Sequence, residues 1–256
     1  MKRVVTALLL VPLVIALVLW GPAWLLLVVT AAVALLCFRE YAAIATPCLG
    51  RSFAALGGAG GLALLAAAET DALLLLVLIT MAAMALAMRT DNLGEALPRV
   101  AALVAGLLYI FGAWRFALLL RARSPYWLLY TLALSWVGDI GAYYVGRRFG
   151  RTRLAARVSP AKSWEGAAAS LVVSVLFGTA FLRWSLPVVP TPAAVALSAI
   201  GNVAGQLGDL AESAVKRGAG VKDSGGILPG HGGMLDRVDS TLFVLPVVYL
   251  YVRLHV

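Results

Sequence analysis

Charged residues are scarce in this sequence, and their scarcity argues against an ordinary soluble domain. Of the 256 residues, 13% are charged and 62% are hydrophobic, whereas a soluble domain is about 25% charged and about 45–50% apolar. A soluble core cannot use that much apolar surface, so the composition predicts a polytopic membrane protein. Negatively charged residues are rarer than positively charged ones, with 12 Asp and Glu against 21 Lys and Arg. In a membrane protein the net charge of +9 indicates basic loops facing anionic lipid rather than nucleic-acid binding.

Cysteine and histidine are nearly absent. Cys37 and Cys48 form no C-x-x-C pair and have no histidine at metal-ligand spacing, so we assign them no role and expect no disulfide. No repeat of fixed period is present, and no clear small-x-small cleavage site follows the apolar run after Met1. We therefore read this first run as an uncleaved helix rather than a signal peptide.

Long apolar runs are what the sequence has in abundance. A helix needs about 17–25 apolar residues to cross a bilayer, so the fold class we expect is all-α, with about nine transmembrane helices. The first four runs are short enough to be tilted or partly re-entrant, and the glycines at 57–61 make the third the weakest helix prediction. The nine runs are 4–20, 22–38, 53–68, 71–88, 98–120, 125–145, 165–186, 192–212 and 238–253.

The distribution of Lys and Arg predicts the orientation of these helices. With the N-terminus in the cytoplasm, 16 of the 21 basic residues fall on the cytoplasmic side and four on the other, as the positive-inside rule requires. We divide the chain into N-terminal helices (1–120, about five spans) and a catalytic region (121–256) with cytoplasmic loops 146–165 and 213–237. Arg39-Glu40-Tyr41, after the second run, is interpreted as an interfacial anchor.

One stretch, from Asp209 to Asp239, concentrates the polar chemistry of the chain. It holds five of the 12 acidic residues, four basic residues, His231 and seven glycines. Carboxylates are the ligands that Mg²⁺ prefers, Lys and Arg bind phosphate oxygens, and glycines let backbone N–H groups approach an anion. The combination predicts a site for phosphate and metal. A charged, solvated loop between two apolar segments is the simpler alternative.

The last 27 residues of this stretch, SAVKRGAGVKDSGGILPGHGGMLDRVD (213–239), resemble the signature of the phosphatidate cytidylyltransferase (CDP-diacylglycerol synthase) family without a departure. The resemblance implies an integral membrane enzyme that joins CTP and phosphatidate to give CDP-diacylglycerol and pyrophosphate in phospholipid biosynthesis. With the charge distribution, we expect it in the bacterial inner membrane with its active site facing the cytoplasm. A second block, SPAKSWEG (159–166), resembles the family's S-P-K-K-T-x-E-G, with Ala161 where Lys is common and Ser163 where Thr is common. Ser163 ahead of Glu165 is also a plain helix start.

Isolated acids within apolar runs are further candidates. Asp139 lies inside the sixth run, and an ionisable residue at that depth is a functional hypothesis by default; an aspartate that snorkels to the interface or pairs with an arginine is the alternative. Asp209 and Glu212 are three residues apart, hence on one helical face, where a cation would relieve their repulsion. Asp239 begins the last run, where the helix dipole alone favours a carboxylate.

These observations and the resemblance together give the candidate site. The expected catalytic residues are Asp209, Lys222, Asp223, His231, Asp236, Arg237 and Asp239. The expected Mg²⁺ ligands are Asp209, Glu212, Asp223, Asp236 and Asp239, with a second cation left open. The expected substrate-binding residues are Asp139, Lys162, Ser163, Ser213, Lys216, Arg217, Gly232 and Gly233. His231 is expected to protonate departing pyrophosphate or to hydrogen-bond it, with a buried, satisfied histidine as the alternative.

The expected partners are CTP, phosphatidate, the lipid bilayer and, in a homodimer, a second copy of the chain; no nucleic acid is expected. A related lipid cytidylyltransferase, a lipid kinase and an ion-coupled transporter are the alternative functions. Transport would explain intramembrane acids such as Asp139 and Asp209, but not the phosphate-binding groups of 209–239. The D-x2-D-G-x2-A-R pattern of CDP-alcohol phosphotransferases is absent.

Overall fold

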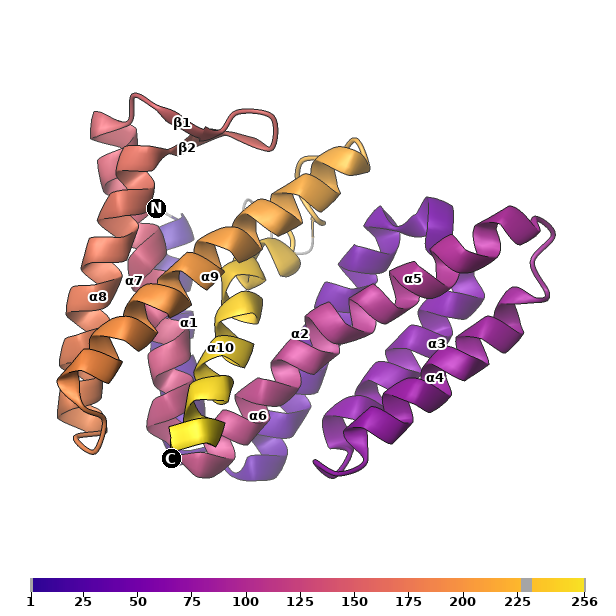
Figure 1. Ribbon diagram of the computed structural model, residues 1–256, viewed down its shortest axis with the longest axis horizontal. Helices are drawn as coiled ribbons and strands as arrows, with labels where there is room; N and C mark the ends of the chain where they lie inside the picture. Colours follow the sequence, from indigo (N-terminus) through magenta and orange to yellow (C-terminus); the bar gives the residue numbers. More distant parts are fainter. Residues whose placement is uncertain (1, 227–231, 256) are drawn as a thin grey trace. The chain divides into compact units, whose positions relative to one another are not determined.

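The computed structural model describes the backbone of residues 2–226 and 232–255, and their side chains outside 2–9 and 46–48. In these residues the regular secondary structure is helical apart from one short hairpin (Figure 1). The α-helices are α1 (Lys2–Trp20), α2 (Ala23–Ile44), α3 (Thr46–Ala66), α4 (Ala72–Ala87), α5 (Ala96–Gly106), α6 (Ala113–Arg123), α7 (Pro125–Phe149), α8 (Trp164–Ser185), α9 (Thr191–Gly218) and α10 (Asp239–His255). The shorter elements are the 3₁₀ turns η1 (Leu93–Glu95) and η3 (Leu235–Arg237), the π-helical segment η2 (Leu107–Gly112), and strands β1 (Arg153–Ala155) and β2 (Ser159–Ser163).

The helices follow the apolar runs of the sequence, which confirms the all-α prediction. Because α5, η2 and α6 form one continuous segment, the described residues make nine helical segments, one for each expected run. Four of the described segments are long and apolar enough to cross a membrane, and α4 and the 10–20 part of α1 are shorter apolar helices. Helices suit this environment because their backbone hydrogen bonds are satisfied internally. The chain is a multi-pass membrane protein.

The chain forms two compact units, which are described separately. Unit 1 contains residues 21–115 and 223–237, and unit 2 contains residues 4–20, 116–222 and 238–256. The boundaries differ from the division expected at residue 120, since the first helix joins the C-terminal helices and the segment 223–237 joins the N-terminal ones. Each unit is formed by contacts between segments that are far apart in the sequence, and the local composition of a segment does not predict such contacts.

Unit 1 is built on α2 to α5, and glycine allows its helices to approach closely. Helix α3 packs against α2, α4 and α5. A Cβ atom placed on Gly60 would lie 2.9 Å from Ile79, and one on Gly106 would lie 2.6 Å from the Tyr41 ring. Gly61 meets the ring of Phe111 in the same way. The glycine-rich run that weakened the helix prediction for α3 is therefore helical, and its glycines serve helix packing.

Unit 2 is built on α7 to α10, with α7 against α8, α8 against α9 and α9 against α10 (Figure 1). A polar cluster joins α8 to α9: the amide nitrogen of Asn202 donates to the hydroxyls of Ser170 (2.8 Å) and Ser174 (2.9 Å). Gly138 of α7 faces this cluster, because a Cβ there would lie 2.7 Å from the Asn202 nitrogen. These contacts hold α7, α8 and α9 close together.

Two features lie beyond the expected boundaries. Helix α9 continues to Gly218, so the first six residues of the expected loop 213–237 are helical. Strands β1 and β2 pair antiparallel, with Arg153 opposite Ser163 and Ala155 opposite Ser159, inside the expected loop 146–165. The hairpin places Lys162 and Ser163 directly before α8.

Candidate active site

The signature stretch is divided between the two units. Residues 209–222 and 238–239 belong to unit 2, and residues 223–237 belong to unit 1. Peptide bonds join the two parts at 222–223 and 237–238.

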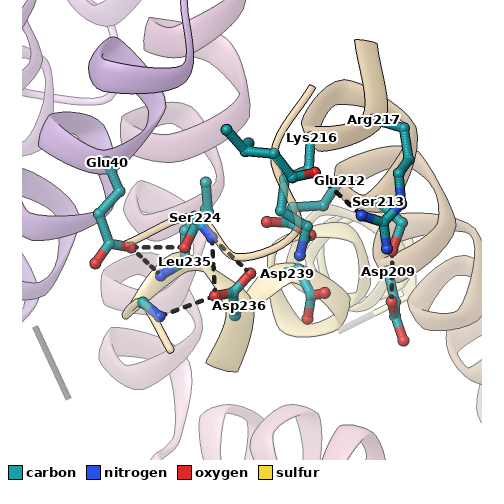
Figure 2. Close-up of polar contacts among 12 residues, drawn as sticks. Glu40, Asp209, Glu212, Ser213, Lys216, Arg217, Ser224, Leu235, Asp236 and Asp239 are labelled. Carbon is teal, nitrogen blue, oxygen red and sulfur yellow. Dashed lines mark hydrogen bonds and ion pairs between the residues drawn. The ribbon is translucent and has the colours of Figure 1, made fainter. Parts of the chain in front are cut away.

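In unit 2, the last turns of α9 carry a buried ion pair. The ammonium of Lys216 contacts the Glu212 carboxylate one turn earlier, and only 10% and 2% of the two side chains are exposed (Figure 2). The i, i+4 spacing places acid and base on one helical face. Lys216 was expected to bind substrate phosphate, and here its charge is engaged with Glu212. Ser213 donates to Asp209 at 3.4 Å on the same helix.

A second ion pair joins the family-like block 159–166 to the polar stretch that begins at Asp209. Lys162 Nζ lies 2.5 Å from Asp209 Oδ2, with 26% and 33% of the side chains exposed. Lys162 lies in strand β2 of the hairpin and Asp209 belongs to α9, 47 positions further along the chain. The two residues were expected at one site for separate reasons, and the fold brings them into contact.

The Lys162–Asp209 pair lines a cavity of about 660 Å³ in unit 2. Its polar lining includes Asp139, Tyr143, Arg147, Ser159, Lys162, Ser163, Ser170, Gln206 and Asp209. Asp139 and Ser163 thus line the same cavity. The Ser163 hydroxyl also accepts the Gly166 N–H at 3.2 Å, so it caps α8 as the helix-start alternative predicted. The volume lies within the range of about 300–1,000 Å³ that is usual for small-molecule sites.

Asp239 adds a buried carboxylate to unit 2. Its side chain is 8% exposed, it begins α10, and its Oδ1 accepts the N–H of Ser240 at 2.7 Å. It lies within electrostatic range of Asp209, Glu212 and Asp139. The helix N-terminus favours one negative charge there, while the neighbouring carboxylates oppose it. The fold therefore concentrates negative charge from α7, α9 and α10.

In unit 1, Asp236 organises the rest of the signature stretch. Its carboxylate accepts the N–H of Ser224 (3.0 and 3.2 Å to its two oxygens) and of Gly233 (2.8 Å) (Figure 2). Gly232 has φ +77°, and a Cβ there would lie 2.8 Å from Asp236 Oδ2. Both its backbone conformation and the close carboxylate require glycine at this position. Gly232, Gly233 and Asp236 were expected in the site and are brought together here.

Glu40 belongs to this cluster, although its place in the sequence did not predict that. Glu40 of α2, assigned to an interfacial anchor, is 3% exposed and accepts hydrogen bonds from Ser224, Met234 and Leu235 (Figure 2). The available signal was an acidic residue at the end of an apolar run, in a chain with few acids. Its partners are more than 180 positions away, which a local reading could not identify.

The remaining expected residues lie at the surface or outside the described residues. Arg217, Lys222, Asp223 and Arg237 are exposed. The Arg217 guanidinium donates to the carbonyl oxygens of Val221 (3.1 Å) and Val158 (3.4 Å). His231 falls among residues 227–231, outside the described part of the chain. The exposed cations are accessible to phosphate groups in solution.

The donor chemistry of the site fits a hard divalent cation. Unit 2 gathers Asp139, Asp209, Glu212 and Asp239, and carboxylate oxygens are the groups that Mg²⁺ prefers. In the described part of the chain, no group of three or more His, Cys, Asp or Glu side chains is placed to hold a metal ion. Mg²⁺ usually takes one or two protein carboxylates and completes its shell with phosphate and water, so the acidic cluster remains compatible with it.

Comparison with known proteins gives one consistent result. A sequence model described as "Cytidylyltransferase family" matches residues 1–255. Over 150 residues the chain is 39% identical to the phosphatidate cytidylyltransferase of Bacillus subtilis, covering 57% of this chain and 56% of that protein. It is 48% identical over 137 residues to the phosphatidate cytidylyltransferase of a Synechocystis strain (51% and 45%). It is also 48% identical over 121 residues to phosphatidate cytidylyltransferase 5, chloroplastic, of Arabidopsis thaliana (46% and 29%). The chain spans about half the length of the curated bacterial relatives it matches.

Proposed function

Because this chain belongs to the cytidylyltransferase family, we propose that it is a phosphatidate cytidylyltransferase. The proposed reaction transfers CMP from CTP to phosphatidate and yields CDP-diacylglycerol and pyrophosphate. The observation that carries the proposal is the cavity of unit 2, where Lys162 of the block 159–166 lies 2.5 Å from Asp209, the first residue of the polar stretch 209–239. Relatives named phosphatidate cytidylyltransferase support the choice of substrates.

The chemistry is a displacement at phosphorus between two anions. A phosphate oxygen of phosphatidate attacks the α-phosphorus of CTP and forms the new P–O bond. The bond from that phosphorus to the β-phosphate breaks, and pyrophosphate leaves with the electron pair. A phosphate monoester is largely ionised at pH 7, because its second pKa is about 6, so no strong general base is required. The protein must instead neutralise charge and hold the two substrates in line.

We assign several basic residues of the chain to the neutralisation of substrate charge. Lys162 and Arg147 line the cavity, and we assign them to a substrate phosphate. Lys162 must exchange its contact with Asp209 for the phosphate, which its partial exposure allows. We assign the exposed Arg217, Lys222 and Arg237 to the triphosphate and to the departing pyrophosphate. For Lys216 the buried pair with Glu212 supports an indirect role, in which it fixes the acidic face of α9.

We propose Mg²⁺ as the cofactor, with its ligands drawn from Asp209, Glu212, Asp223, Asp236 and Asp239. When bound, the cation would neutralise charge on the triphosphate and on the leaving group. The carboxylates themselves keep anionic substrate from entering without a cation, because phosphate and carboxylate repel each other. We further propose that this site faces the cytoplasm from the inner membrane of a bacterium, where CTP is available.

A single assay tests the function. Membranes containing the chain are incubated with CTP labelled in its α-phosphate, with and without phosphatidate, and lipid extracts are counted. We expect label to enter lipid only when phosphatidate is present. Label that requires a different lipid acceptor would indicate a related cytidylyltransferase. In a parallel incubation with CTP labelled in its γ-phosphate, label that enters lipid would indicate a lipid kinase, and no label in lipid from either form of CTP would favour the transporter.

A Mg²⁺ titration tests the cofactor. Asp223 is exposed and Asp239 buried, yet we expect Asp223→Asn and Asp239→Asn both to raise the Mg²⁺ midpoint. Turnover should fall by about 10²–10³-fold or more, the usual loss when one group that stabilises transition-state charge is removed. Lys222→Ala is the matched comparison, and it should raise the KM for CTP with a smaller effect on the Mg²⁺ midpoint. Aspartate variants that keep the wild-type midpoint would show that these two residues are not ligands.

A further inference from the structure

Glu40 is a buried carboxylate that the proposed mechanism does not use. Its Oε2 accepts hydrogen bonds from the Ser224 hydroxyl (2.9 Å) and the Leu235 N–H (2.8 Å), and its Oε1 accepts the Met234 N–H (2.9 Å). Burying a carboxylate is costly unless its hydrogen bonds are satisfied. Here three donors satisfy it, and all three belong to the segment 223–237.

The contacts of Glu40 extend to the glycines of that segment. A Cβ atom on Gly225 would lie 2.6 Å from Glu40 Oε1, and one on Gly233 would clash with Glu40 and with the Ser224 hydroxyl. Glycine at both positions therefore lets the backbone close around the carboxylate. Asp236 accepts the N–H groups of Ser224 and Gly233. Glu40 and Asp236, which are far apart in the sequence, therefore both bind the segment that contains Ser224 and Gly233.

The residues that Glu40 binds are neighbours of the expected functional ones. Ser224 follows Asp223 directly, and Met234 and Leu235 immediately precede Asp236, which lies with Leu235 in the 3₁₀ turn η3. A shift of these backbone groups would move both aspartates.

We infer that Glu40 is a positioning residue, which holds the segment bearing Asp223 and Asp236 in the geometry that the reaction needs. The inference rests on the proposed cytidylyltransferase function. A side chain of α2, remote in sequence, sets the position of Asp223 and Asp236 through hydrogen bonds to residues next to them.

Glu40→Gln is the sharpest test, because glutamine has nearly the same shape and volume. Glutamine offers one acceptor oxygen and one donor NH₂ group. In either orientation its NH₂ group meets a backbone N–H, that of Met234 or that of Leu235. We expect kcat to fall by about 10–100-fold, the usual loss when a group supporting the site is removed. Glu69→Gln makes the same chemical change on an exposed side chain of the same unit and should leave kcat unchanged.

Amide hydrogen exchange gives a readout that does not depend on turnover. In the detergent-solubilised full chain, Glu40→Gln should speed exchange at Met234 and Leu235 and leave the amides of α2 at the wild-type rate. Ser224→Ala removes one of the three hydrogen bonds and should give a smaller change in the same direction. If Glu40→Gln does not insert or fold, Ser224→Ala still carries the test.

The outcomes separate this inference from the proposed function. A wild-type chain that transfers no label defeats the proposed function, and with it the positioning role in that reaction. Faster exchange with unchanged kcat would make Glu40 a structural brace only and would overturn the inference. Unchanged exchange and unchanged kcat in both variants would overturn it as well. Faster local exchange together with a lower kcat supports it.

Discussion

At the scale of single residues, the buried negative charge on α9 is neutralised by a neighbouring lysine. Glu212 is buried, and its contact with Lys216 offsets the cost of removing a carboxylate from water. A buried pair adds little net stability over an apolar pair, but loss of one partner is severe because it leaves a buried charge uncompensated. This asymmetry makes the pair a sensitive point of unit 2.

Lys216→Met should therefore destabilise the fold by about 3–5 kcal/mol, measured by thermal or denaturant unfolding in detergent. The double variant Glu212→Gln/Lys216→Met should recover much of that loss, since it leaves no uncompensated charge. Arg217→Met, at the next and exposed position, is the matched control and should unfold like the wild type. Equal unfolding of Lys216→Met and Arg217→Met would contradict the importance of the buried pair.

Residue types and spacing predicted much of the site but not its contacts. Lys162 was expected because it belongs to a family-like block, and Asp209 because it begins the polar stretch 209–239. Their contact depends on the hairpin that precedes α8. Glu40 was missed because its partners are remote in sequence. Lys216 was expected at phosphate, since a lysine in a basic stretch gives no sign that a glutamate one turn away will be buried with it.

At the scale of elements, the apolar runs determine the helices well. Lipid leaves helices as the natural solution for long apolar segments, so the nine runs and the nine helical segments agree. Helix ends in polar stretches were harder to predict: α9 runs on to Gly218 because Ser213 to Arg217 contain no helix breaker. The β1–β2 hairpin was not expected, since its strands are three and five residues long and lack an apolar alternation.

The packing of α7 against α8 and α9 gives an element-scale prediction. Gly138→Ala would place a methyl group 2.7 Å from the Asn202 nitrogen and 2.9 Å from the Ser174 hydroxyl. Such overpacking costs about 1–3 kcal/mol, and it should also lower activity because Asp139 is the next residue. Gly141→Ala, one turn later on α7, meets its nearest atoms only at 3.4 Å and should be tolerated. Unfolding and label transfer measured on both variants would test the difference.

At the scale of the whole molecule, the sequence predicts orientation through charge. The nine helical segments found among the described residues are an odd number, so membrane crossings by all of them would place the two ends on opposite sides. The excess of Lys and Arg in the expected cytoplasmic loops then predicts that the N-terminal end lies inside. The division into two units, in contrast, could not be anticipated, because it pairs the first helix with the last ones.

Reporter fusions at the two ends of the chain would test this topology. We expect a cytoplasmic reporter to be active at the N-terminal end and an external reporter at the C-terminal end. A third fusion between β1 and β2, within residues 156–158, should report the cytoplasm. Identical locations for the two ends would contradict nine crossings and require an even number.

The ion pair of Lys162 with Asp209 also links the binding of opposite charges. An anion that takes Lys162 releases Asp209 for a cation, and a cation that takes Asp209 releases Lys162 for an anion. Each ligand then raises the affinity for the other by the same factor, as thermodynamic reciprocity demands. An anion that binds without a cation replaces the attraction of Lys162 for Asp209 by its own attraction to Lys162, so little binding free energy is gained. The cavity would thus discriminate in favour of phosphate that arrives together with its counterion, and against free anions of the cytoplasm.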